Sequence, residues 1–209
     1  MLRTGVRLVV FLAFATGVVL VRPGRAQDWY GAATYQISFP LGDTKTFANK
    51  TSFRGIGFDF RKTVSPSTTL GVTFGWNVFH RRVRETLEID TENPGAVTGV
   101  QDRTINAFPI MLNVHRYFGH EGGVQPFVGL NAGGYIMAQR FDIGLFTFQK
   151  DQWQWGVAPE IGFAIPLQSG STLFINGKYN YAFTGKSAVG TDVNNSYISV
   201  GIGFAWLQY

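Results

Sequence analysis

The sequence predicts an all-β fold: eight antiparallel strands that close into an up-and-down transmembrane barrel, preceded by a cleavable signal peptide. Three observations predict it. From residue 30 onward, apolar residues alternate with polar or small ones, which is the period of a strand and not of a helix. The connections between these alternating segments are short and long in turn. After residue 26, no apolar run approaches the ~20 residues that a membrane-spanning helix requires.

Residues 1–26 have the layout of a secretory signal peptide. Two arginines precede an apolar run from Leu8 to Val21, and Gly24 and Ala26 supply small residues at the −3 and −1 positions of a cleavage site. The run is shorter than a spanning helix, which favours a cleaved leader over an uncleaved membrane anchor. We therefore expect cleavage after Ala26.

The remaining residues, 27–209, form one domain. The chain has no cysteine, which excludes disulfides, thiolate metal sites and cysteine nucleophiles. Most of the net charge of +5 comes from four arginines in the leader, so the domain itself is nearly neutral. A nearly neutral domain has no electrostatic footprint for nucleic acid, and no nucleic-acid partner is expected.

Eight segments carry the two-residue period, with apolar residues on one face and mostly glycine, asparagine and threonine on the other. In chain order, the segments and their apolar residues are 33–39 (Tyr35, Ile37, Phe39), 54–62 (Ile56, Phe58, Phe60), 69–79 (Leu70, Val72, Phe74, Trp76, Val78), 106–117 (Phe108, Ile110, Leu112, Val114), 126–138 (Val128, Leu130, Ala132, Ile136), 153–165 (Trp155, Val157, Ile161, Phe163, Ile165), 172–183 (Leu173, Ile175, Tyr179, Tyr181, Phe183) and 196–209 (Ile198, Val200, Ile202, Phe204, Trp206). Pro109 and Pro159 lie inside two of these segments, and each predicts a bulge or a locally broken pair.

The connections alternate in length. Those after the second, fourth and sixth segments are short (VSPST, GHEGG and QSG), and the others span about 41–51, 80–103, 139–152 and 184–195. Short turns at one end and long loops at the other are typical of outer-membrane barrels, whose short turns face the periplasm. The Asn93-Pro94-Gly95 turn predicts that the loop over 80–103 continues the adjoining strands as a hairpin beyond the membrane.

The composition of the two faces indicates which one meets lipid. The polar face carries too few charges to be a solvated exterior, and its glycines and amides suit a narrow interior, so we expect the apolar face to point outward. A soluble barrel or sandwich with the apolar face inward is the alternative. Aromatic residues near strand ends are expected to form girdles at the lipid–water boundaries: Tyr117, Phe118, Trp153, Tyr181, Tyr197 and Trp206.

The chain resembles the eight-stranded outer-membrane β-barrel superfamily, which includes the outer-membrane protein A-like, W-like and opacity-type porin barrels. The resemblance covers residues 28–209 and is carried by QPFVGLNAGGY, by the hairpin from WGVAPEIGFAIPL to KYNYAF, and by the terminal aromatic Tyr209. It implies location in the outer membrane and contact with the assembly machinery, with outer-membrane lipid and with lipopolysaccharide. The phase of the last strand departs from the family, because Trp206, Phe204 and Ile202 alternate out of step with Tyr209.

The predicted interior holds a candidate ionic network. A turn centred near Ser169 places Glu160 opposite Lys178, and both lie on the polar face, where an opposed pair would neutralise two costly charges. Asp59, Arg61 and His115 are expected to join it. Because eight strands leave a bore just wide enough for side chains, we expect a packed polar plug and a structural or surface-interaction role for a monomer. The alternative is a small channel for apolar or small solutes, as in W-like barrels.

No enzyme, cofactor or metal site is predicted. A hydrolytic triad needs a serine beside a histidine, but no serine is close in sequence to His80, His115 or His120. The three histidines also lack the spacing of metal ligands. Near the outer boundary, Arg81, Arg82 and Arg84 are candidate contacts for lipopolysaccharide phosphates, because guanidinium groups bind phosphate through forked hydrogen bonds. The alternative is a solvated loop in which these arginines pair with Glu85 and Glu88.

Overall fold

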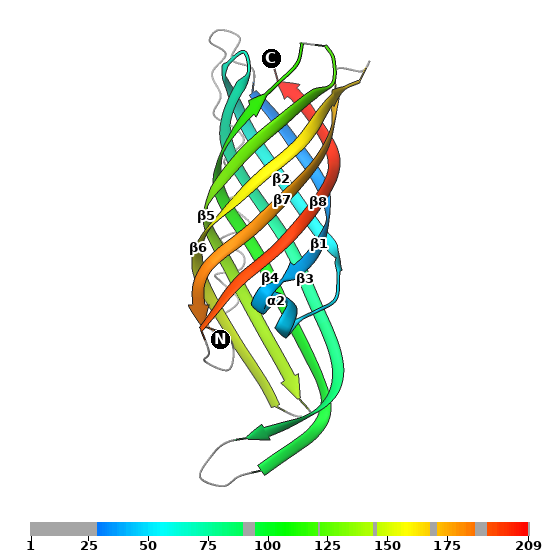
Figure 1. Cartoon of the computed structure of the whole chain (residues 1–209), viewed down its shortest axis with the longest axis vertical. Coiled ribbons are helices and arrows are strands. Elements are labelled where there is room, and N and C mark those ends of the chain that lie inside the picture. Colours follow the sequence, from blue (N-terminus) through cyan, green and yellow to red (C-terminus); the bar gives the residue numbers. More distant parts are fainter. Residues whose placement is uncertain are drawn as a thin grey trace, which may run out of the picture.

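The computed structural model describes residues 29–89, 95–120, 122–143, 146–167, 171–186 and 192–208. In this part of the chain, eight antiparallel strands follow one another around a closed barrel, and β1 pairs with β8 (Figure 1). The elements are β1 (Trp29–Leu41), α2 (Gly42–Phe47), β2 (Ser52–Ser65), β3 (Thr68–Ile89), β4 (Gly95–Tyr117), β5 (Gln125–Ile143), β6 (Phe146–Pro166), β7 (Ser171–Lys186) and β8 (Asp192–Gln208). The predicted eight-stranded barrel is confirmed, whereas the expected signal peptide over 1–26 lies outside the described residues.

The strands turn their apolar residues outward. Leu112 is 70% exposed while its neighbour Asn113 is 4% exposed. Leu130 and Phe163 are each 49% exposed on the same outer surface, which confirms the predicted orientation. A belt of exposed apolar side chains surrounds the barrel, far larger than the patches that soluble monomers expose, and it matches the hydrocarbon of a bilayer. Among the described residues, no helix is long and apolar enough to span a membrane.

Two aromatic residues expected in the girdles lie inside the barrel instead. Tyr197 is 1% exposed and belongs to a buried cluster, and the Tyr117 hydroxyl bonds inward to Arg61. Each sits on the inward phase of its strand, so strand alternation and not proximity to a strand end decides its position. Phe118, Trp153 and Trp206 are exposed, as expected for girdle residues.

The short turns gather at one end of the barrel and the long connections at the other (Figure 1). Much of the long connections is itself strand: β3 reaches Ile89 and β4 begins at Gly95, as predicted for a hairpin that continues beyond the membrane. Likewise, β5 ends at Ile143 and β6 begins at Phe146. The first long connection holds a feature that was not predicted, the six-residue helix α2.

Both interior prolines interrupt a ladder without shifting its register. The β3–β4 ladder skips from Phe74↔Ile110 to Asn77↔Ala107, opposite Pro109. The β6–β7 ladder skips in the same way past Pro159. The prediction of a locally broken pair is therefore correct at both positions, because proline has no N–H to donate.

Candidate functional site: the filled interior of the barrel

Glu160 is the centre of a buried ionic network. It lies opposite Lys178 in the β6–β7 ladder, which is the register predicted from the turn. Its Oε2 is 3.3 Å from Lys178 Nζ and 3.2 Å from His115 Nε2. Asn131 Nδ2 donates to the same oxygen at 3.0 Å, and Asn176 Nδ2 donates to Oε1 at 2.6 Å. Side chains from three other strands therefore converge on one carboxylate that is 2% exposed.

Asp59 and Arg61 form the second half of this network. Arg61 Nη2 is 2.9 Å from Asp59 Oδ1, and both residues are 1% exposed. Lys178 Nζ is 4.0 Å from the same carboxylate oxygen, which links the two halves. Thr73 donates its hydroxyl to Asp59 Oδ1 at 2.5 Å. The structure thus brings together all five residues expected in the interior network, in which two acidic side chains lie beside two basic ones and His115.

His115 is held flat against the wall of the bore. Its ring stacks on Phe127 with centroids 5.1 Å apart and 15° between the planes. Gly129 pairs with His115 across the β4–β5 ladder. A Cβ at this glycine would lie 2.6 Å from the imidazole Cδ2, so the position requires glycine. A motif that looks like simple strand packing in the sequence, the glycine of PFVGL, thus makes room for the imidazole.

An aromatic layer lies at the periplasmic side of the network. Arg61 Nη1 donates at 3.0 Å to the hydroxyls of both Tyr30 and Tyr117, and these two hydroxyls also bond to each other. The guanidinium carbon lies 5.6 Å from the ring centroids of Tyr30 and Phe174. These contacts compensate a charge that would otherwise be costly to bury.

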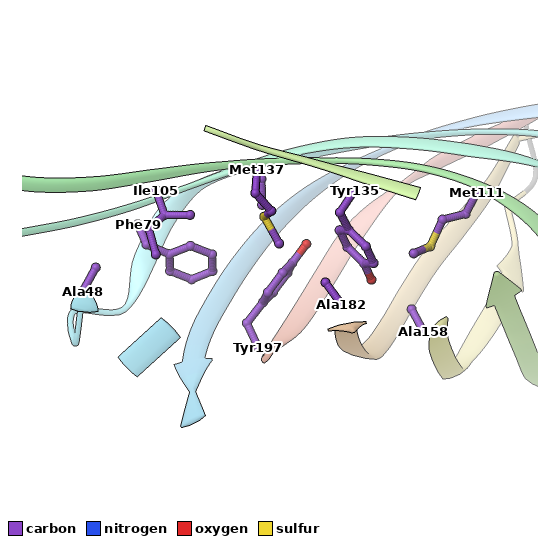
Figure 2. Packing of buried hydrophobic residues seen from close by; sticks show 10 residues of the cluster. Ala48, Phe79, Ile105, Met111, Tyr135, Met137, Ala158, Ala182 and Tyr197 are labelled. Carbon is purple, nitrogen blue, oxygen red and sulfur yellow. The ribbon is translucent and has the colours of Figure 1, made fainter. Parts of the chain in front are cut away.

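A second, mostly apolar layer fills the bore on the extracellular side of the network (Figure 2). Phe79 and Tyr197 pack edge to face with centroids 5.1 Å apart, and Tyr135 meets Tyr197 at 6.5 Å. Met137 and Ile105 complete the layer, each 1% exposed. Between the ionic network and this apolar layer lies a small cavity of about the size of a water molecule. Its lining includes Lys178, Asn180, Asn77 and Gln36.

Helix α2 covers the extracellular end of the bore. Ala48, which follows it, is fully buried in the apolar layer. Ser196 N–H donates to Thr44 Oγ1 at 3.0 Å, and Asn194 N–H donates to Asp43 Oδ2 at 2.8 Å. The helix is therefore fastened to β8 by its own side chains. We call α2 with Ala48 the lid.

The three arginines expected to contact lipopolysaccharide do not share one face. Arg81 is on the inner face, where its Nη1 donates to the Thr46 carbonyl of the lid at 3.4 Å. Arg82, the next residue, is exposed on the outer face. The Arg84 side chain lies outside the described residues. Contact with lipopolysaccharide stays a prediction. Of the two side chains that the structure describes, only Arg82 lies on the outer surface, where it could make this contact.

Ionisable residues on the outer surface above the apolar belt pair with one another. His80 Nδ1 is 3.2 Å from Asp102 Oδ1. Hydrogen bonds from Arg140, at 2.7 Å, and from Thr147, at 2.6 Å, lower the pKa of the Asp142 carboxyl. Among the described residues, no group of three histidine, aspartate or glutamate side chains is arranged to hold a metal. The geometry here is that of local surface pairs.

No family model matches the chain, and no curated protein matches it. Solved structures do. Neisserial surface protein A has 12% identity and a TM-score of 0.54, with 88% of this chain and 99% of that chain covered. A major outer membrane protein from Thermus thermophilus has 10% identity and a TM-score of 0.55, with 88% and 100% covered. The outer membrane protein OprG from Pseudomonas aeruginosa has 16% identity and a TM-score of 0.51, with 91% and 100% covered.

The closed strand order and the exposed apolar belt together define an integral membrane β-barrel. Its fold is that of the eight-stranded outer-membrane barrels, as the resemblance implied. A barrel with this fold and this outer belt belongs in the outer membrane. At these identities the similarity defines the fold, and a role must be argued from the interior of the barrel.

Proposed function

We propose that this protein is a closed outer-membrane barrel with a structural or surface-interaction role and no catalytic activity. The observation that carries the proposal is the filling of the bore by three barriers in series. These are the ionic network around Glu160, the apolar layer around Tyr197, and the lid. An ion would have to displace or cross each of them.

The ionic network and the apolar layer oppose the passage of an ion by different physical effects. The ionic network holds its charges by mutual pairing, so separating them to admit an ion costs several kcal/mol per unpaired charge. The apolar layer offers a passing ion no polar partner, and hydrophobic constrictions close pores by excluding water. Residues in both layers are almost completely buried, with Glu160 at 2% and Tyr135 at 0% exposure.

The second candidate is a narrow channel for apolar or small solutes. The cavity between the two layers favours it, because its lining mixes Met111 and Ala158 with the amides of Asn131 and Asn180. In this alternative the layers would separate to admit a solute.

Planar-bilayer recording of the refolded full-length chain distinguishes the two. The closed barrel is expected to give no discrete conductance steps. Heat-modifiable gel mobility of the same refolded sample serves as the control that the barrel has folded before its conductance is recorded. Reproducible steps from the wild-type chain would contradict the closed barrel and support the channel.

A further inference from the structure

The barrel wall between β6 and β7 lacks a ladder at its extracellular end. The two strands pair up to Gly156↔Ala182, and the described residues show no pair beyond it. Strand β6 nevertheless continues to Phe146 and pairs there with β5. At the same level, β7 is irregular on its other side, where its register with β8 shifts between Ala182 and Gly185. A bulge of this kind bends its strand and disrupts local pairing.

A line of polar side chains crosses this seam on the inside of the barrel. Asn195 Nδ2 on β8 donates to Gln154 Oε1 on β6 at 2.9 Å. The other end of the same amide, Asn195 Oδ1, accepts the Thr44 hydroxyl of the lid at 3.3 Å. We call Gln154, Asn195 and Thr44 the amide brace. The three residues are 2%, 2% and 1% exposed, so water does not compete for these bonds.

Strand β7 keeps small residues where the brace passes. Ala182 pairs with Asn195 in the β7–β8 ladder and has only a methyl group to place beneath the bridge. A Cβ at Gly185 would lie 2.9 Å from Gln152 Oε1 and closer still to the amide nitrogen of Gln154. The side chains of β6 therefore occupy the space next to Gly185 and lean toward the part of the wall that has no ladder.

We propose that the amide brace substitutes for the missing ladder and couples the lid to the β6–β7 seam, so that the two open together. Gln154 holds β6 through Asn195, and Asn195 holds the lid through Thr44. Releasing either end frees Asn195 to turn away from the other. An opened seam would face the outer part of the bilayer, where the exposed side chains of Trp155 and Phe183 flank it.

Hydrogen–deuterium exchange with mass spectrometry, on the full-length chain refolded into lipid nanodiscs, tests this coupling. The variant Thr44→Val removes the lid end of the brace, and Gln154→Leu removes the wall end. Each is expected to raise exchange about fivefold or more in both regions, the lid (42–48) and the seam (152–156 and 182–186). Gln154→Leu removes one buried hydrogen bond, and Thr44→Val removes two, because Thr44 Oγ1 also accepts the Ser196 N–H. Thr34→Val, which removes a buried hydroxyl elsewhere on the bore wall, is the matched control and is expected to change neither region.

Coupling is overturned if Thr44→Val changes only the lid and Gln154→Leu changes only the seam, or if neither changes anything. A further variant guards against misfolding. Gly185→Ala deletes no bonding group and only presses a methyl group against Gln154, so it is expected to raise exchange in the distant lid. Unchanged lid exchange in Gly185→Ala would overturn the proposal independently.

Discussion

Replacing Glu160 with alanine is expected to lower the free energy of unfolding by about 3–5 kcal/mol, the cost of removing one partner from a buried ion pair. The carboxylate accepts hydrogen bonds from two asparagines, lies within ion-pair distance of Lys178 and His115, and is 2% exposed. Its removal leaves the buried Lys178 ammonium without its nearest anion. Urea titration of tryptophan fluorescence, with the barrel refolded in lipid vesicles, measures the loss.

A double variant separates the loss of pairing from the loss of packing. Glu160→Leu with Lys178→Met removes both charges and keeps most of the volume. It is expected to recover about half or more of the stability lost in Glu160→Ala, because no cation is then stranded in the bore. A double variant as unstable as the sum of the single ones would show that the pair does not act as a unit.

The second large effect is expected on the outer surface. Leu112 lies midway along the membrane-crossing part of β4, between Phe108 and Tyr117, and is 70% exposed. Leu112→Arg should therefore cost about 2–4 kcal/mol, as for a cation on the lipid face at the bilayer midplane. The same urea titration measures it.

Val114→Arg supplies the matched control for depth. It faces the same side of β4 one step closer to the periplasmic end, next to the exposed Arg116. Because the cost of a lipid-facing cation falls toward the interface, this variant is expected to be the milder of the two. Equal stability of Leu112→Arg and wild type would mean that Leu112 faces water.

Much of this architecture could be predicted because strands alternate strictly. The two-residue period sets which residues face lipid, and a short turn near Ser169 sets the register that places Glu160 opposite Lys178. Asp59, Arg61 and His115 lie at inward-facing positions of their own strands, and this alternation alone places them in the same bore. Local sequence is sufficient to predict the register of two neighbouring strands where a tight turn joins them.

Features that depend on contacts between distant segments could not be predicted. The lid sequence GDTKTF is short and polar and has no helical period, and it is positioned by Asn194 and Asn195 from the other end of the chain. The apolar layer escapes prediction because Tyr197 lies near a strand end, where an aromatic residue is typical of a girdle. The alternation of the strands could have predicted this layer, because it places Phe79, Tyr135 and Met137 at inward-facing positions. Proximity groups Arg81 with Arg82, although alternation sends the two to opposite faces.

The central claim is that apolar side chains face lipid and polar ones fill the bore, and the tryptophans test it without any substitution. All five are on the outer surface, 40% to 65% exposed: Trp29, Trp76, Trp153, Trp155 and Trp206. In vesicles of brominated phosphatidylcholine, the wild-type fluorescence is expected to lose most of its intensity relative to unbrominated vesicles, while aqueous acrylamide quenches it weakly. Fluorescence that is quenched by acrylamide and not by brominated lipid would contradict the claim.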